Sequence, residues 1–342
     1  MEIEPFTVRL TTPLETAAGR VKRREGFLVV LTHRGTSGVG EATPLAGWTE
    51  SKSECRAALG RAAEIADELD WGIALTKTDA PAARHALALA LSDARARAVG
   101  QPLYRSLDGD RLVTSVPVNA TIGDQPPDAT ADAAATACRE GFGTLKLKVG
   151  ARPVSTDIER VRAVRARVGD GVELRTDANG AWTHSEARDA VEAFADLGVS
   201  YVEQPLPADD LQGHASLRGG AVDIALDESL IEQSAEAIID ADAADVLVIK
   251  PMIVGGPDRA RELAMTVRQA GADPVISTSV DAVVARTGAV HVAASLPNVR
   301  PCGLATGALL ADDIAADPAP VTDGAIEVPQ GKGLGLPDRS AW

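Results

Sequence analysis

From about Ser115 onward, short apolar segments alternate with helical ones about 25 residues apart, and this repeat restricts the fold more than any other feature of the chain. A strand, an amphipathic helix and the next strand within that length form the βα unit of a parallel sheet. Helical periodicity separates the segments at Ile158–Val168, Glu186–Leu197 and Arg259–Ala270. The eight expected strands are Val116–Asn119, Leu145–Lys148, Val172–Asp177, Tyr201–Glu203, Ile224–Asp227, Val246–Lys250, Pro274–Ser277 and Arg300–Gly303. Eight such units predict a compact α/β barrel of the (β/α)8 type.

An open, doubly wound parallel sheet would show the same alternation of strands and helices. Such sheets commonly carry a Gly-x-Gly-x-x-Gly turn or a Walker A loop after the first strand, and the sequence has neither motif. The barrel is therefore the favoured architecture.

The first 110 residues follow a different pattern and predict a separate α+β domain. Strand-like segments at Phe6–Leu10 and Gly26–Leu31 are followed by turn residues, and an alanine-rich helical region runs from Ser51 to about Gly100. We expect a domain at 1–110, a barrel at 111–310, and a turn-rich tail at 311–342 that folds back onto the first domain.

Charged residues stand at the ends of five consecutive barrel strands: Lys146 and Lys148, then Asp177, Glu203, Asp227 and Lys250. From Lys148 onward they are separated by 29, 26, 24 and 23 residues, so each advances by one barrel unit. The carboxyl ends of the strands meet at one mouth of such a barrel, where active sites lie.

Lys146 and Lys148 are two residues apart on a strand, so they share a face. Repulsion between their ammonium groups is expected to lower the pKa of at least one of them, and a lysine that is neutral near pH 7 can act as a general base. The alternative is an edge strand whose lysines face solvent. Lysine is scarce, however, with seven in the chain, and three of these fall on barrel strands.

Three carboxylates at adjacent strand ends would repel one another in a shared cavity unless a cation balanced them. Hard oxygen ligands suit Mg²⁺, with Mn²⁺ as an alternative. Taken singly, Asp177, Glu203 and Asp227 could instead be helix caps or surface charges. Lys148 and Lys250 lie on opposite sides of the three acids in strand order.

Composition limits the kinds of partner. A net charge of −15 argues against nucleic acid and anionic membranes. Hydrophobic content of 45%, without an apolar run long enough to span a bilayer, predicts a soluble protein. The N-terminus is acidic and lacks the basic start and apolar core that are typical of a signal peptide. Three cysteines at no metal-ligand spacing favour a reducing cytoplasm. The acidic, lysine-poor composition suits a cytoplasm of high salt.

The motifs at the strand ends resemble those of the enolase superfamily, in its muconate-lactonizing subgroup: Lys146-Leu147-Lys148, Asp177-Ala178-Asn179, Glu203-Gln204-Pro205, Asp227-Glu228-Ser229 and Lys250-Pro251. The resemblance implies a capping domain on a modified (β/α)7β barrel, with Asp177, Glu203 and Asp227 as metal ligands and Lys148 and Lys250 as acid/base lysines. The mandelate-racemase branch would place a His–Asp pair on later strands, whereas none of the five histidines here ends an expected strand, and His291 falls in a helical stretch where packing or surface exposure is expected.

Within the subgroup, three stretches are similar to o-succinylbenzoate synthases: Gly40–Trp48, Val275–Asp281, and Gly303–Gly307 with Ala311–Ile314. Dipeptide epimerases carry Asp-x-Asp near the eighth strand to hold an α-ammonium, where this chain has Leu304-Ala305-Thr306. One departure is Asp281, where the synthases usually have the longer glutamate.

The resemblance implies a Mg²⁺-dependent lyase of menaquinone biosynthesis that takes a small carboxylate substrate, removes its α-proton and eliminates water. Lys148 would remove the proton and return it to the departing hydroxyl, while Lys250 would stabilise the enediolate. The implied substrate contacts are Lys146, Asn179, Ser277, Gly303 and Arg175, although Asn179 and Ser277 could instead cap strand ends. Loops around Thr16–Arg24 and Trp48 would complete the pocket.

Two other functions remain open. An N-succinylamino acid racemase, or a related racemase or cycloisomerase of the subgroup, would use the same lysines and metal ligands. A non-catalytic binding protein on a decayed barrel is the alternative of a different class.

Overall fold

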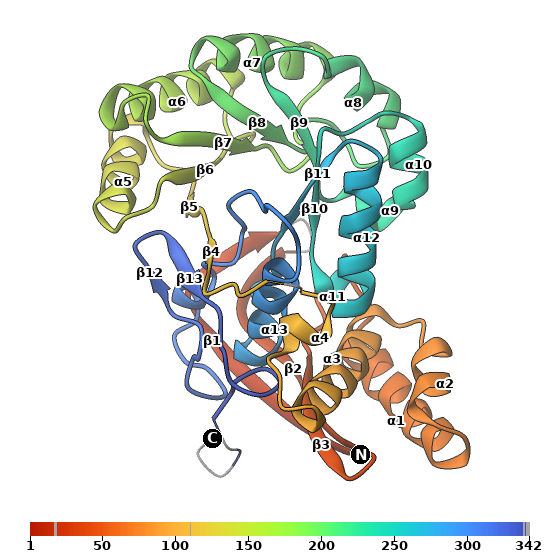
Figure 1. The fold of residues 1–342 in the computed structure, drawn as a ribbon. Helices are drawn as coiled ribbons and strands as arrows, with labels where there is room; N and C mark the ends of the chain where they lie inside the picture. The colour runs from red at the N-terminus through yellow and green to blue at the C-terminus, as the bar shows by residue number, and fades with distance from the viewer. Residues whose placement is uncertain (17–18, 110, 338, 340–342) are drawn as a thin grey trace.

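The computed structural model describes residues 1–16, 19–109, 111–337 and 339, which form an antiparallel sheet with helices set against a barrel (Figure 1). Within these residues, the barrel sheet is parallel and has the order β11-β10-β9-β8-β7-β6-β5. Its strands are β5 (Ala120–Ile122), β6 (Thr144–Lys148), β7 (Glu173–Asp177), β8 (Val199–Glu203), β9 (Asp223–Leu226), β10 (Val246–Ile249) and β11 (Asp273–Ile276).

The segment around Cys302 closes the barrel. Isolated parallel bridges join Val118 to Cys302 and Ser277 to Gly303, so this segment lies between the first and last strands of the sheet. The predicted modified barrel with a capping domain is therefore confirmed.

The first expected strand, residues 116–119, is divided between two sheets. Val116 lies in β4 (Ser115–Pro117), which pairs with β13 (Ala325–Glu327), whereas Val118 bridges Cys302 of the segment that closes the barrel. The first continuous barrel strand, β5, follows at Ala120. β12 (Val321–Thr322) completes the small antiparallel sheet of β4 and β13.

Helices cover the outside of the curved sheet (Figure 1). They are α5 (Pro127–Arg139), α6 (Val154–Val168), α7 (His184–Asp196), α8 (Leu211–Leu217), α9 (Ser229–Glu232), α10 (Ala235–Asp240) and α12 (Pro257–Gln269). α11 (Pro251–Val254) and α13 (Val283–Ala294) lie on the side of the capping domain, where both contact its helices, and the short 3-10 turn η1 (Gly307–Leu309) follows α13. Leu145 and Leu147 of β6 pack outward in the core formed with α5 and α6. Strand alternation therefore turns Lys146 and Lys148 into the barrel.

The capping domain consists of a three-stranded sheet and an alanine-rich helical layer. Its elements are β1 (Glu2–Thr16), β2 (Gly19–His33), β3 (Thr36–Ala42), α1 (Lys52–Glu68), α2 (Trp71–Thr76), α3 (Pro81–Ala98) and α4 (Leu103–Ser106). β3 lies so close to α3 that a Cβ on Gly40 would sit 2.0 Å from the carbonyl oxygen of Ala86. Glycine on the strand and alanine on the helix permit this approach.

The loop predicted at Thr16–Arg24 is mostly strand. Thr16 ends β1 and Gly19 begins β2, while residues 17 and 18 lie outside the described part of the chain. His33, contrary to the expectation for histidines, ends a strand, but this strand is β2 of the cap rather than a barrel strand.

Two buried joints fix the cap on the barrel. The carboxylate of Glu41, at the end of β3, accepts hydrogen bonds from the backbone N–H groups of Ala282 (2.9 Å) and Ala285 (2.8 Å). Ala282 is the N-cap of α13 and cannot cap the helix itself, so Glu41 satisfies these N–H groups from the other domain. On α3, Arg84 donates to the Gly255 carbonyl and pairs with Asp258 at 2.8 Å.

The C-terminal segment contacts both domains. β13 pairs with β4, whereas Gly333 exchanges backbone hydrogen bonds with Gln101 and Leu103, and Arg339 pairs with Glu4 at 2.6 Å. None of the helices in the described residues is long and apolar enough to cross a membrane.

His291 lies in the packed interior. Of the two roles expected for it, packing is confirmed and surface exposure is wrong. Its ring stacks on Tyr104 with centroids 6.1 Å apart, and its nitrogens contact the Tyr104 N–H and the Leu334 carbonyl. Burial lowers the pKa of His291 from 6.5 to about 4. A group with a depressed pKa is neutral in the fold but takes up a proton on unfolding.

We therefore expect His291 to destabilise the fold as the pH falls from about 6.5 towards 4. A single proton of difference changes the free energy of unfolding by about 1.4 kcal/mol per pH unit. Urea unfolding across this pH range should give a shallower pH dependence for His291→Gln than for the wild type. Parallel curves for the two proteins would contradict the assignment.

Candidate active site

The three acids predicted as metal ligands meet at the carboxyl ends of adjacent strands. Asp177 and Glu203 are directly paired residues of β7 and β8, and Asp227 follows β9. All three are buried. The side chain of Gln204 is also fully buried. Its oxygen accepts a hydrogen bond from the backbone N–H of Asp227 (3.1 Å), which ties the end of β8 to the end of β9.

Both lysines of β6 turn towards these acids. Lys146 Nζ lies 2.9 Å from Asp177 Oδ2 and 2.8 Å from Glu203 Oε1. Lys148 Nζ lies 2.7 Å from the same Asp177 oxygen. From the other side, Lys250 Nζ lies 2.5 Å from Asp227 Oδ2. The structure thus brings together the six charged side chains that the sequence placed at strand ends.

The expected repulsion between the two lysines does not set the pKa of Lys146. Burial would lower this pKa, but the carboxylates of Asp177 and Glu203 raise it well above its ordinary value. The sequence analysis expected a lowered pKa for at least one of the two lysines, and Lys146 does not show it, because its ammonium group and that of Lys148 share a carboxylate oxygen of Asp177.

The acids divide the negative charge unequally. Burial would raise the pKa of Asp177, but Lys146 and Lys148 hold it well below its ordinary value. Burial and the neighbouring Asp177 raise the pKa of Glu203 to about 8. The second oxygen of Glu203, Oε2, is buried without a hydrogen-bond partner. The carboxylate cluster is therefore not fully balanced by the lysines.

Asp177, Glu203 and Asp227 are the residues that could hold a divalent cation. Across the described residues, no three His, Cys, Asp or Glu side chains form a ready metal cluster, and ammonium groups stand between these carboxylates instead. The donor set nevertheless fits a hard cation, since it consists of carboxylate oxygens and includes the unpartnered Glu203 Oε2.

Asn179 connects Lys148 to a further acid. Its side-chain oxygen accepts from Lys148 (2.9 Å), and its nitrogen donates to Glu228 (2.8 Å). Asn179 is exposed and has a φ of +46°, a left-handed conformation that asparagine tolerates. It is thus placed to orient Lys148. Sequence reasoning gave Glu228 no role, because an acid next to Asp227 could not be distinguished from a helix-cap residue.

Ser277 and Gly303 form one wall of the mouth. Ser277 Oγ donates to the Gly303 carbonyl at 3.2 Å, and a Cβ on Gly303 would lie 2.6 Å from that hydroxyl. Glycine at 303 therefore lets the eighth strand position pack against β11. A side chain there would displace Ser277.

Arg175 does not line the mouth. Its guanidinium is fully buried and contacts Glu173 (2.8 Å), the Pro301 carbonyl (2.6 Å) and the Tyr201 ring. Glu173 begins β7, so the side chain points towards the opposite end of the strand from Asp177. The structure gives no support to the predicted substrate contact, and Arg175 instead fills the barrel interior.

Trp48 of the capping domain reaches the site. Lys250 Nζ lies 3.8 Å from the centroid of its indole ring. A cation over an aromatic face is attracted to it, so the cap contributes directly to the environment of Lys250. The sequence indicated the Trp48 loop as part of the pocket but gave no means of identifying this contact.

Asp281 lies behind the mouth rather than in it. It is buried, and Ser279 Oγ donates to it at 2.6 Å. Its charge also contributes to raising the pKa of Glu41 to about 7, after burial as the main cause. The shorter side chain at this position is thus involved with its own loop and the joint between the domains.

Lysines on both sides of three buried carboxylates, at the mouth of a capped barrel, form an arrangement that can transfer a proton next to an anionic group. A family model described as "Enolase C-terminal domain-like" matches residues 129–339. The chain belongs to this family of the enolase superfamily.

Curated relatives carry out different reactions. The chain is 30% identical to the L-Ala-D/L-Glu epimerase of Bacillus subtilis, with 98% of the chain and 95% of the relative covered, and 32% identical to the o-succinylbenzoate synthase of Thermobifida fusca, with 92% and 85% covered. A substrate-liganded structure of the Bacillus subtilis epimerase superposes with a TM-score of 0.88 at 30% identity, covering 98% and 97% of the two chains. A dipeptide epimerase of Enterococcus faecalis, complexed with Mg and L-Leu-L-Tyr, superposes with a TM-score of 0.87 at 27% identity, covering 98% of each chain.

The contact between Trp48 and Lys250 should be measurable as a coupling free energy. A double-mutant cycle with Trp48→Leu and Lys250→Met, followed by denaturant unfolding, is expected to give about 0.5–2 kcal/mol, the range of cation–π pairs. The same cycle with Trp71→Leu, in α2, is the matched control and should give no coupling. Equal values for the two tryptophans would contradict a specific contact.

Proposed function

We propose that this protein is a Mg²⁺-dependent o-succinylbenzoate synthase of menaquinone biosynthesis. It removes the α-proton of 2-succinyl-6-hydroxycyclohexadiene carboxylate and eliminates the ring hydroxyl as water. The observation that carries the proposal is the lack of a carboxylate at Leu304-Ala305-Thr306, where the dipeptide epimerases that this chain resembles hold an ammonium group. Close packing of Gly303 on Ser277 keeps this wall free of side-chain charge.

The similarity to the synthase of Thermobifida fusca over most of both chains supports the proposed synthase activity, although epimerase relatives are equally similar. A substrate with only negative and neutral groups suits a wall without carboxylates. A substrate with a free ammonium group would lose its hydration there without gaining a counter-charge.

Asp177, Glu203 and Asp227 would hold the Mg²⁺. When bound, the cation supplies positive charge to the substrate carboxylate, which stabilises the negative charge that develops there on proton removal. Lys146, which is paired with two of these acids, keeps them in place and contributes positive charge behind them.

Lys148 is proposed as the general base. In its neutral form, its Nζ takes the α-proton, and the electron pair of the broken C–H bond moves into the substrate carboxylate, which becomes an enediolate. This pair then returns to form the ring double bond as the C–O bond to the hydroxyl breaks. The same Nζ returns that proton to the departing oxygen, so that water leaves and no redox partner is required. Asp177 and Asn179 orient the amine by accepting hydrogen bonds from it.

Lys250 is proposed to remain charged and to stabilise the enediolate from the opposite side. In the sheet, three strands separate its strand from that of Lys148. Its ammonium group lies between Asp227 and the face of Trp48, both of which favour positive charge.

Replacement of either lysine by alanine should reduce turnover of the cyclohexadiene substrate by at least about 100-fold, the usual contribution of a positioned acid or base. Circular dichroism and Mg²⁺ titration calorimetry should show a retained fold and retained metal binding. Glu203→Gln should weaken Mg²⁺ binding, and a chelator should remove the activity of the wild type. Turnover that persists in Lys148→Ala or Lys250→Ala would reject these roles.

Racemisation of an N-succinylamino acid is the second candidate, because the two lysines approach from opposite sides, as a two-base reaction needs. The wild type in deuterium oxide should then exchange the α-proton of N-succinyl amino acids, which proton NMR detects. We expect dehydration of the cyclohexadiene to be faster than this exchange. Faster exchange, with no dehydration, would assign the protein to the racemases.

A further inference from the structure

A cavity of about 600 Å³ lies in the capping domain, apart from the barrel mouth. We call it the cap pocket; it is lined by His33, Arg34, Asp70, Trp71, Gly72 and Arg95. These residues come from the end of β2, the turn that follows it, the start of α2 and the last turn of α3. The turn is at one end of the seven-residue β3, and the Glu41 joint at the other. A strand of that length extends roughly 20 Å, so the cap pocket is separate from the active site.

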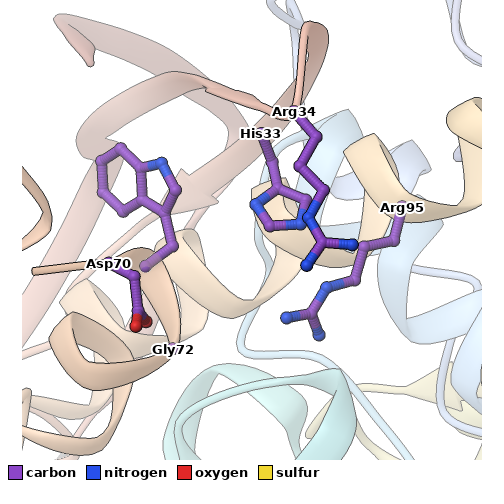
Figure 2. A pocket seen from close by; sticks show the side chains of 6 residues that line it. His33, Arg34, Asp70, Gly72 and Arg95 are labelled. Carbon is purple, nitrogen blue, oxygen red and sulfur yellow. The ribbon is translucent and has the colours of Figure 1, made fainter.

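The cap pocket gathers positive charge on an acidic protein. Figure 2 shows the guanidinium groups of Arg34 and Arg95 pointing into the same space, with the ring of His33 beside Arg34. No hydrogen bond or ion pair joins either arginine side chain to another described residue. The pKa of His33 is lowered by burial and then by the charges of Arg95 and Arg34, so the three basic groups act on one another.

Two guanidinium groups without carboxylate partners are suited to an anion, because each can donate two parallel hydrogen bonds to a phosphate or carboxylate. Asp70 is the acidic residue of the cap pocket, and its carboxylate already has a partner. It accepts a hydrogen bond from the backbone N–H of Ile73 at 2.9 Å and caps α2. A polyanion is disfavoured by the net charge of −15, and the volume suits a small molecule.

Trp71 provides an aromatic surface in the same cavity. Its indole N–H donates to the Thr32 carbonyl at 3.1 Å, which fixes the ring against the sheet. Part of the indole packs against the hydrophobic core of the cap, and its remaining apolar surface lines the cap pocket. Flat rings stack favourably on such a surface.

We propose that the cap pocket is a second binding site for a small anion that combines a phosphate or carboxylate group with a planar ring. Arg34 and Arg95 bind the anionic group, and Trp71 packs against the ring. The proposal does not depend on the reaction catalysed in the barrel, because no residue of the active site takes part.

Titration calorimetry of the whole protein at low ionic strength, without divalent cations, tests the site. The probes are adenosine monophosphate (a phosphate with a ring), phthalate (carboxylates on a ring), inorganic phosphate and uncharged adenosine. We expect saturable binding of at least one ring-bearing anion, weaker binding of inorganic phosphate, and none of adenosine. The preferred probe distinguishes phosphate from carboxylate as the anionic group.

Charge-removing variants identify the location. Arg34→Gln and Arg95→Gln should each weaken binding by about tenfold or more, as expected for loss of a charge-assisted bidentate contact. Trp71→Leu should weaken only the ring-bearing probes. Arg162→Gln, at an exposed arginine of α6, is the matched control and should bind like the wild type. Turnover should be unchanged in Arg34→Gln and Arg95→Gln.

Two results would overturn the proposal. One is that none of the charged probes binds saturably, or that Arg34→Gln and Arg95→Gln bind as tightly as the wild type. The other is equal affinity for inorganic phosphate and for adenosine monophosphate, which would remove the role of Trp71. Circular dichroism of each variant shows whether the fold is retained.

Discussion

Negative charge buried at the mouth of the barrel must be balanced by positive charge, and this requirement accounts for the arrangement of the site. Strand register places Asp177 beside Glu203, and burial in a low dielectric makes their mutual repulsion large. Lys146 reduces it by bridging the two acids, and Lys148 reduces it by pairing with Asp177. Lys250 balances the third acid, Asp227, from the other side. The unpartnered oxygen of Glu203 marks the point where this balance is incomplete. The same excess of negative charge that makes the site costly for the fold also makes it attractive to a cation.

The capping domain is part of the site's construction as well as its cover. Glu41 of β3 caps α13, the helix that follows the loop carrying Ser277 and Asp281, so the position of this loop depends on a residue of the other domain. Trp48 follows Glu41 by seven residues and touches Lys250. The cap therefore fixes both the wall at Ser277 and the environment of one lysine, and displacement of the two domains would disturb both together.

The sequence allowed the barrel, the cap and the meeting of the charged strand ends to be predicted, because a strand period and a βα repeat determine which residues face inward and at which end. It could not determine how far along the barrel axis a side chain reaches. Arg175 shares a face with Asp177 but points to the other end of the strand, and this difference depends on partners such as the Pro301 carbonyl. Contacts between distant residues were equally out of reach: Glu41 and Ala282 are 241 positions apart. Nor could it show that the first expected strand is shared between two sheets, with β4 pairing with β13 while Val118 bridges Cys302.

Removal of a proton next to a carboxylate is common to many reactions, so a triad of acids between two lysines does not determine the product. Specificity must come from groups that contact the rest of the substrate. At this mouth those groups are few and uncharged on one side, because Gly303 packs on Ser277 and Thr306 contacts Thr278 through their hydroxyls at 2.8 Å. On the other side, Trp48 presents an aromatic ring over Lys250. Once a cation balances the acids at its base, as proposed above, a mouth with lysines on both sides and uncharged walls would favour a substrate whose charge is concentrated on carboxylates and whose remainder is an uncharged ring.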